Sequence, residues 1–168
     1  MSLILRHQPE VIQMSLSHDG WADMGELIEK ANHHGFNFSR ESIAEIVATS
    51  DKQRFKISDD GQRIRANQGH SVPVDVGLER KIPPETLFHG TATRFIESIQ
   101  AQGLIPGSRQ YVHLSADEAT ATQVGKRHGE PVVLSIESAK MHADGFEFFL
   151  SENQVWLTKQ VPAECIKF

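Results

Sequence analysis

The segment 85–95 reads ETLFHGTATRF, and it predicts how the second half of the chain is organised. Its first residues have the apolar and aromatic pattern of a short strand, and a helix is expected to begin at Arg94. The strand is therefore expected to end at a turn that carries His89, Gly90 and Thr91. A glycine there lets a ligand approach the backbone, and a threonine hydroxyl can hydrogen-bond a ribose or an amide.

A second strand of the same kind, YVHLS at 111–115, also presents a histidine beside a hydroxyl. Ser115, followed three residues later by Glu118, predicts a capping box and a helix that ends near Gly129. A buried, hydrogen-bonded histidine next to a helix-capping hydroxyl explains each strand end equally well. The two strands alone therefore do not decide whether His89 and His113 bind a ligand.

The rest of the second half continues the pattern of short strands. They are expected in the segments TLFHG, YVHLS, PVVLSIE, FEFFL and QVWLTKQV, with helices between the first few. A segment with three prolines, GHSVPVDVGLERKIPPE at 69–85, precedes them and is typical of a linker. Residues 73–168 are therefore predicted to form an α+β lobe.

The chain begins with an apolar helix pattern, MSLILRHQPE. Pro9 disfavours helical backbone at the residue before it, so this helix is expected to end near His7. Arg6 and His7 then lie in the last turn, where both can point toward one site. Only five residues precede Arg6, so this first helix is expected to be short or frayed.

The remainder of the first half predicts two helices and a hairpin. Asp23, with an acidic residue three positions later, is a predicted N-cap of a helix that stops at Gly35. A second helix is expected from Ser39. The segment RFKISDDGQRIRAN at 54–67 alternates on both sides of DDG, which is a hairpin signal. Helices followed by a hairpin predict a winged-helix-like lobe, residues 1–72.

Charge limits the partners of the chain. The formal net charge is −5, and neither half carries an excess of basic residues, so a long nucleic-acid footprint is disfavoured. A few arginines suited to one or two phosphates remain, because a guanidinium is planar, always charged and bidentate. The candidates are Arg6, Arg54, Arg65 and Arg109. Periodicity alone does not bring them together.

Several classes of site are not indicated. The single cysteine, Cys165, cannot form an internal disulfide or a paired zinc motif. The histidines include no HxxxH pattern with a downstream acid, so no metal site is expected. No apolar run reaches about 20 residues and no signal peptide is recognised, so a cytoplasmic protein without a membrane partner is expected. P-loop, Rossmann and G-x-S-x-G motifs are also missing.

Taken together, a series of motifs resembles the RNA 2′-phosphotransferase family. The motifs follow the family's order over nearly the whole chain: LILRHQPE, GWADMGELI, ATSDKQRFKI, IRANQGHS, LFHGTATRFIESIQAQGLIPG, RQYVHLSADEATATQVGKRHG and NQVWLT. The resemblance implies an N-terminal winged-helix lobe, 1–72, and a C-terminal ADP-ribosyltransferase lobe, 73–168. It also implies an enzyme, expected to be a monomer, that uses NAD⁺ to remove an internal RNA 2′-phosphate, such as the one left by some tRNA ligation pathways.

The resemblance implies a two-step reaction. The RNA 2′-phosphate attacks C1″ of the nicotinamide ribose, which releases nicotinamide and gives an ADP-ribosylated RNA. The ribose 2″-hydroxyl then attacks the phosphorus. The products are RNA with a free 2′-hydroxyl and ADP-ribose 1″,2″-cyclic phosphate.

The resemblance also assigns site residues. The family's essential set maps onto Arg6, His7, Arg54 and Arg109, which are expected to surround the transferred phosphate. The NAD-binding elements map onto His89, Gly90, Thr91, His113, Ser115 and Val155. Many other ADP-ribosyltransferases have glutamate at the last position. The GHS motif at 69–71 is expected to lie at the lobe junction and contact phosphate.

Val155 is consistent with the implied chemistry. A phosphomonoester, with a second pKa of about 6, is already anionic near neutral pH, so it needs positioning rather than a general base. Arginines orient it in the first step and stabilise charge on the phosphoryl oxygens in the second. His7 is a hypothetical general acid toward the departing RNA 2′-oxygen, because it adjoins Arg6.

Two alternatives stay open. A protein or small-molecule mono-ADP-ribosyltransferase would use the same NAD⁺ pocket, although Val155 argues against it. A winged-helix module that binds nucleic acid without catalysis would use residues 1–72 alone, although the acidic balance of that lobe weakens this reading.

Overall fold

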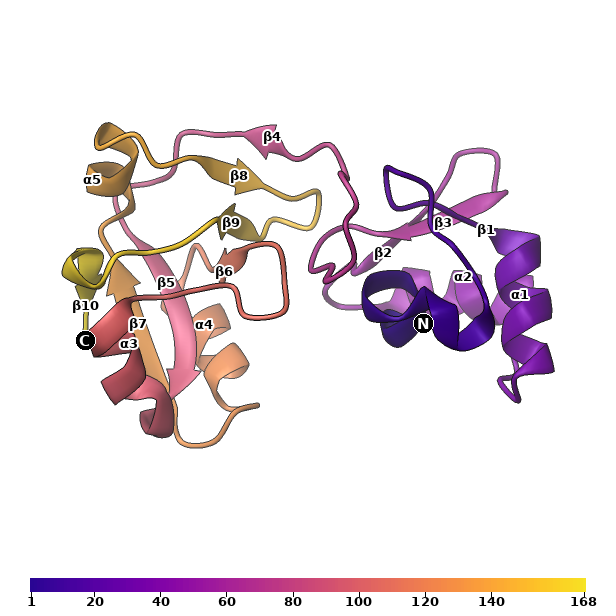
Figure 1. Ribbon diagram of the computed structural model, residues 1–168, viewed down its shortest axis with the longest axis horizontal. Helices are drawn as coiled ribbons and strands as arrows, with labels where there is room; N and C mark the ends of the chain where they lie inside the picture. Colours follow the sequence, from indigo (N-terminus) through magenta and orange to yellow (C-terminus); the bar gives the residue numbers. More distant parts are fainter. The chain divides into compact units, whose positions relative to one another are not determined.

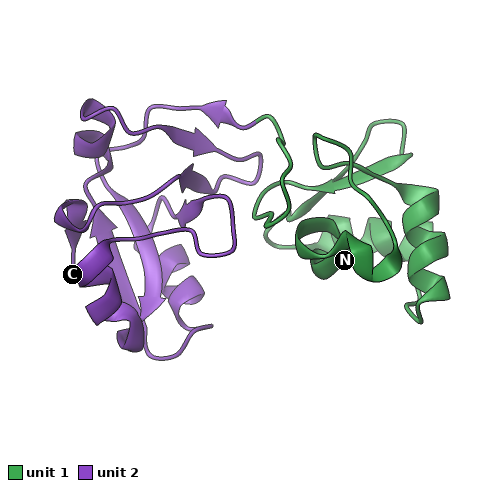
Figure 2. Ribbon diagram, viewed as in Figure 1, with its two compact units in different colours: residues 1–77 green, residues 78–168 purple.

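The computed structural model describes residues 1–168 and divides into two compact units, Met1–Gly77 and Leu78–Phe168 (Figure 2). This division and the predicted boundary after residue 72 both fall within the proline-containing segment 69–85. Helices and antiparallel sheets occur in both units. The architecture is therefore of the α+β class, as the sequence predicts.

The first unit contains helices and one small antiparallel sheet (Figure 1). Its elements are η1 (Leu3–His7), η2 (Pro9–Ile12), β1 (Ala22–Asp23), α1 (Met24–His33), α2 (Arg40–Thr49), β2 (Phe55–Ile57) and β3 (Arg63–Ala66). The strand order is β1-β3-β2. Phe55 pairs with Ala66 and Ile57 with Ile64, so the predicted hairpin is confirmed.

Local side-chain bonds begin both helices of this unit. The Asp23 carboxylate accepts from the backbone N–H of Glu26 at 2.8 Å, and the Ser39 hydroxyl accepts from the N–H of Ser42 at 3.1 Å. Each bond satisfies one of the N–H groups that a helix leaves without an intrahelical partner. The predicted N-cap at Asp23 and the predicted helix start at Ser39 are confirmed.

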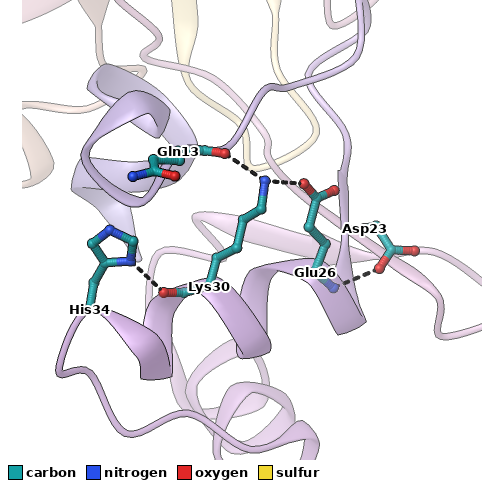
Figure 3. Close-up of polar contacts among 5 residues, drawn as sticks. All are labelled: Gln13, Asp23, Glu26, Lys30 and His34. Carbon is teal, nitrogen blue, oxygen red and sulfur yellow. Dashed lines mark hydrogen bonds and ion pairs between the residues drawn. The ribbon is translucent and has the colours of Figure 1, made fainter.

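Figure 3 shows how α1 is tied to the preceding turn. Lys30 forms an ion pair with Glu26 at 2.6 Å, one helical turn away, and donates to the carbonyl of Gln13. Gln13 has a φ of 55° and ends η2. Lys30 thus connects α1 to the segment that follows the Arg6–His7 pair.

The core of the first unit anchors η1. Its fully buried side chains include Ile4, Leu5, Ile12, Leu27, Ile43 and Ile64. Ile4 and Leu5 are 1% and 0% exposed. Although η1 is a single turn of five residues, it is held by packing immediately before Arg6 and ends at His7 as predicted.

The second unit contains two antiparallel sheets and flanking helices (Figure 1). Its elements are β4 (Glu79–Arg80), β5 (Leu87–Ala92), η3 (Thr93–Phe95), α3 (Ile96–Gln102), β6 (Val112–Leu114), α4 (Glu118–Gly125), β7 (Pro131–Ile136), α5 (Ser138–Ala143), β8 (Phe148–Leu150), β9 (Trp156–Thr158), η4 (Ala163–Cys165) and β10 (Ile166–Lys167). The strand orders are β10-β7-β5 and β4-β8-β9-β6. All five predicted strands are present as β5 to β9.

A short backbone bridge joins the two sheets. The N–H of Phe88 donates to the carbonyl of Ser115 at 2.9 Å, and the N–H of Ser115 donates to the carbonyl of Phe88 at 2.7 Å. β5 and the end of β6 therefore lie side by side.

Cys165 is buried in the core of this unit, and burial raises the pKa of its thiol.

Two local predictions for this unit are wrong. β5 does not end at Gly90, because His89, Gly90 and Thr91 all pair with β7, and the strand continues to Ala92. A 3₁₀ turn follows before α3 begins at Ile96. The β-branched partners on β7, Val132 and Val133, favour extension of the ladder past the glycine.

The predicted capping box at Ser115 is also wrong. Asp117 caps α4, since its carboxylate accepts from the N–H of Thr120 at 2.7 Å. Ser115 instead uses its backbone groups to pair with Phe88. The helix ends at Gly125 rather than near Gly129.

Candidate active site

The predicted site residues fall into two groups, one in each unit. The first unit holds Arg6, His7 and Arg54, and the second holds His89, Gly90, Thr91, Arg109, His113, Ser115 and Val155. Each group is described by itself below.

Arg6 is a buried arginine in the first unit. It is 6% exposed, and its guanidinium carbon lies 5.7 Å from the centre of the Phe55 ring, within reach of a cation–π contact. Arg54 precedes Phe55 in the chain, and its carbonyl accepts from the N–H of Asn67 at 3.0 Å. Arg6 therefore contacts the ring of the residue that follows Arg54 in the chain.

His7 contacts the GHS segment. Its Nδ1 lies 3.0 Å from the Ser71 hydroxyl, and the Ser71 N–H donates to the carbonyl of Arg6 at 2.9 Å. The short turn η1 and the segment after β3 are therefore joined at the Arg6–His7 pair. The sequence distance between the partners is 64 residues for the side-chain contact.

His70 is a buried histidine close to the positive charges of this group. It is 2% exposed, and its Nε2 has no hydrogen-bond partner. Burial, followed by the positive charges of Arg6, His7 and Arg65, lowers the pKa of His70 to about 4. The ring is neutral at pH 7, and the cations that depress its pKa would stabilise an anion.

We expect His70 to make the folded protein sensitive to acid. Above pH 6.5 the His70 ring is neutral in both the folded and the unfolded chain, so it does not reduce the free energy of unfolding. As the pH falls from 6.5 toward about 4, the ring is protonated in the unfolded chain but still neutral in the folded one, and the free energy of unfolding falls. The loss over this window is on the order of 3 kcal/mol. Urea unfolding at pH 7, 5.5 and 4 should give a clearly shallower decline for His70→Gln. Parallel declines in both proteins would contradict the role given to His70.

In the second unit, a line of hydrogen bonds connects Arg109 to His89. Arg109 Nη1 lies 2.7 Å from His113 Nδ1. Because a guanidinium can only donate, this ring nitrogen accepts, and His113 is neutral with its proton on Nε2. The His113 carbonyl accepts from His89 Nδ1 at 2.9 Å, which places the His89 proton on Nδ1.

His89 is consequently an acceptor at its other ring nitrogen. Burial lowers its pKa, the bond to the His113 carbonyl partly offsets this, and the positive charge of His128 adds to the lowering. A neutral Nε2 can accept from a hydroxyl, and a neutral ring does not repel a cationic ligand. This combination suits a sugar attached to a positively charged group.

Ser115 and Val155 complete the neighbourhood. Ser115 pairs with Phe88, the residue before His89. β6 and β9 pair Leu114 with Trp156, and Ser115 and Val155 are the residues that adjoin this last pair in the chain. Backbone and hydroxyl bonds to Ser151 hold both the N–H and the carbonyl of Val155. The predicted NAD-binding residues of this unit thus lie in β5 and β6 or directly beside β6 and β9.

The comparisons with known proteins agree with this arrangement of motifs. A family model described as RNA 2′-phosphotransferase, Tpt1 / KptA family, matches residues 1–160. The chain belongs to this family. It is therefore related to transferases that act on RNA, and the resemblance noted in the sequence is confirmed.

Relatives of the RNA 2′-phosphotransferase family align over nearly the full chain. A protein from Acaryochloris marina is 56% identical over 164 residues, which cover 98% of this chain and 91% of the relative. One from Pectobacterium carotovorum is 57% identical over 99% of this chain and 90% of the relative. One from Agrobacterium fabrum is 54% identical over 96% and 87%. Each is described as a probable RNA 2′-phosphotransferase.

Gly90 has a structural role that the sequence did not indicate. A Cβ atom at Gly90 would lie 1.7 Å from the carbonyl oxygen of Ala121, and one at Gly125 would lie 2.6 Å from the carbonyl oxygen of Thr91. α4 therefore packs directly on the backbone of β5 through two glycines (Figure 1). This close contact explains the glycine at position 90 without any ligand.

Within β5, side chains alternate between two faces. Gly90 points toward α4, whereas His89 and Thr91 share the opposite face. Thr91 is 5% exposed, so its hydroxyl is largely buried. Of the three residues predicted from this strand, His89 has the contacts expected of a polar ligand-binding group.

Sequence reasoning missed part of the first group. The sequence indicates Phe55 only as a strand residue, and for His70 and Ser71 it predicts phosphate contact but no contact to Arg6 or His7. The GHS motif was a sufficient signal to mark the segment, but nothing local links Ser71 to His7.

Two further properties of the structure concern metals and membranes. No group of three or more His, Cys, Asp or Glu side chains is placed to hold a metal ion. None of the helices is both long enough and apolar enough to cross a membrane.

Proposed function

We propose that this member of the RNA 2′-phosphotransferase family uses NAD⁺ as co-substrate. An oxygen of the internal RNA 2′-phosphate bonds to C1″ of the nicotinamide ribose while the bond from C1″ to nicotinamide breaks. The ribose 2″-hydroxyl then bonds to the phosphorus while the bond to the RNA 2′-oxygen breaks. That oxygen takes up a proton, which leaves 2′-hydroxyl RNA and ADP-ribose 1″,2″-cyclic phosphate.

The line of bonds from Arg109 through His113 to His89 is the observation that carries this proposal. His89 is fixed by the His113 carbonyl, and burial keeps its ring neutral. In the proposal His89 accepts from a ribose hydroxyl, and its neutrality suits the positive charge of nicotinamide. Backbone groups at Gly90 and the hydroxyl of Ser115 provide further polar contacts for the ribose and the carboxamide, whereas the largely buried Thr91 is assigned to packing.

Val155 supports a phosphate as the acceptor. An alcohol or amide acceptor gains from a carboxylate near the reacting ribose, but a 2′-phosphate is already anionic and would be repelled by one. Val155, which adjoins the last pair of β6 and β9, is instead apolar. We assign Val155 to packing beside the ribose.

Arg6, His7, Arg54 and Arg109 are assigned to the transferred phosphate. Guanidinium groups bind its oxygens bidentately and stabilise the negative charge that builds on them during the second step. Burial is the largest cause of the low pKa of His70, and the further lowering by the charges of Arg6 and His7 supports a positive field at these residues. His7 is assigned as the general acid toward the RNA 2′-oxygen.

We further propose that the two units correspond to a winged-helix-like lobe and an ADP-ribosyltransferase-like lobe. The helices followed by a hairpin in the first unit, and the two antiparallel sheets joined at Phe88 and Ser115 in the second, are compatible with this assignment. The proposed substrate is a tRNA-like RNA, in splicing or repair within the cytoplasm.

A direct assay tests the proposal. The protein is incubated with NAD⁺ and a short RNA that carries one internal 2′-phosphate, and the expected products are 2′-hydroxyl RNA, nicotinamide and ADP-ribose 1″,2″-cyclic phosphate in equal amounts. The same RNA with only a terminal 3′-phosphate is the control substrate. Dephosphorylation that proceeds equally well without NAD⁺, or no reaction at all, would overturn the proposal.

A further inference from the structure

Ser71 makes two contacts to the Arg6–His7 pair that the reaction above does not use. Its N–H donates to the Arg6 carbonyl at 2.9 Å, and its hydroxyl lies 3.0 Å from His7 Nδ1. One contact fixes the backbone of Ser71 to that of Arg6, and the other reaches the neighbouring ring. Two bonds to consecutive residues determine both the position and the direction of the hydroxyl.

The segment around Ser71 is held on both sides, so this arrangement is not that of a loose loop. His70, the residue before it, is 2% exposed. Farther along the chain, the N–H of Asp75 donates to the carbonyl of His18 at 2.9 Å. A Cβ on Gly20 would lie 3.3 Å from the Val76 side chain, which shows how closely this segment packs on the turn before β1.

The hydroxyl can serve both protonation states of His7. It has one proton to donate and lone pairs to accept, and its two nearby partners are His7 Nδ1 at 3.0 Å and the Arg6 carbonyl at 3.5 Å. When the ring is neutral, the hydroxyl donates to Nδ1 and the ring proton lies on Nε2. When the ring is protonated, Nδ1–H donates to the hydroxyl oxygen, whose own proton turns to the Arg6 carbonyl.

We propose that Ser71 is a positioning residue for the transfer reaction, which holds the His7 ring and engages Nδ1 so that Nε2 is the nitrogen that exchanges a proton with the substrate. This rests on the proposed role of His7 as general acid. A carboxylate in place of the hydroxyl would favour only the protonated ring, whereas Ser71 keeps the ring in place before and after proton transfer. His7 is the last residue of η1, so this contact orients the ring where the turn ends.

The nitrogen spectrum of His7 tests the proposal without RNA or NAD⁺. In protein with ¹⁵N-labelled histidine, the neutral His7 ring is expected to show the Nε2–H tautomer, and Ser71→Ala should shift it to a mixture of both tautomers. Ser71→Thr, which keeps the hydroxyl, should retain the wild-type pattern. Ser58→Ala is the matched control, because Ser58 also bonds a side chain and a backbone carbonyl in the first unit. An unchanged His7 tautomer in Ser71→Ala would overturn the proposal.

Kinetics provide the second readout. Ser71→Ala is expected to lower kcat roughly 5- to 10-fold, the effect of one lost hydrogen bond, with KM for both substrates unchanged and activity restored in Ser71→Thr. An equal loss in the alanine and threonine variants would mean that Ser71 acts through packing and would refute the proposal. Absence of NAD-dependent transfer in the wild type would refute the proposed function, while the tautomer measurement would still decide whether Ser71 sets the state of His7.

Discussion

Arg109→Gln is expected to lower kcat for RNA 2′-phosphate transfer by about 100- to 1,000-fold, the usual effect of removing one preorganised donor to a developing negative charge. Glutamine can still donate a hydrogen bond, but it carries no charge to stabilise the phosphoryl oxygens. It also breaks the 2.7 Å contact to His113, so KM for NAD⁺ should rise as well. Steady-state rates with 2′-phosphorylated RNA, measured over a range of NAD⁺ concentrations, give both values.

Two variants make the Arg109 result interpretable. Arg109→Lys keeps the charge but loses the planar fork, so it should recover only part of the rate. Arg94→Gln is the matched control, because Arg94 is an exposed arginine of the same unit whose guanidinium stacks on Phe95 at 4.7 Å. If Arg109→Gln retained more than half of the wild-type rate, Arg109 would have no role at the transferred phosphate.

Several predictions based on neighbouring residues are confirmed in the first unit. The N-caps at Asp23 and Ser39 depend on backbone groups three residues away, and the hairpin of β2 and β3 depends on alternation around one turn. Such features are determined within a few residues of sequence, so pattern and turn chemistry suffice. The family motifs likewise identified the chain without any structure.

Predictions that required a distant partner failed or were incomplete. Ser115 has the sequence of a helix cap, but its backbone pairs with Phe88, and Asp117 takes the capping role. The contact between Ser71 and His7 joins two motifs that sequence analysis treated separately. Neither pairing leaves a periodic signal, because each depends on how two elements pack.

Gly90 is the clearest example of this limit. A glycine beside a histidine in a short strand predicts room for a ligand, whereas in the structure α4 occupies that space. The relevant neighbour is the backbone of Ala121, and the sequence does not indicate that this helix lies on β5. The structure therefore predicts that a side chain at position 90 lowers the stability of the fold, rather than only the affinity for a ligand.

Gly90→Ala is therefore expected to destabilise the second unit by about 3 kcal/mol or more, at the upper end of the range for overpacked cores. The added Cβ would lie 1.7 Å from the Ala121 carbonyl oxygen and 2.9 Å from the Gly125 nitrogen. These are backbone atoms, so no flexible side chain can move aside, and pairing with β7 restrains the strand on its other side. Differential scanning calorimetry should show the melting temperature of this unit lowered by roughly 10–20 °C.

Gly25→Ala is the matched control for this substitution. A Cβ at Gly25 would meet only the Asp23 side chain at 3.3 Å, within α1 of the first unit, where alanine is the better helix former. Its melting temperature should stay unchanged or rise slightly. If Gly90→Ala instead melted like the wild type and lost only affinity for NAD⁺, Gly90 would serve the ligand, and the direct packing of α4 on β5 would not be the reason for the glycine.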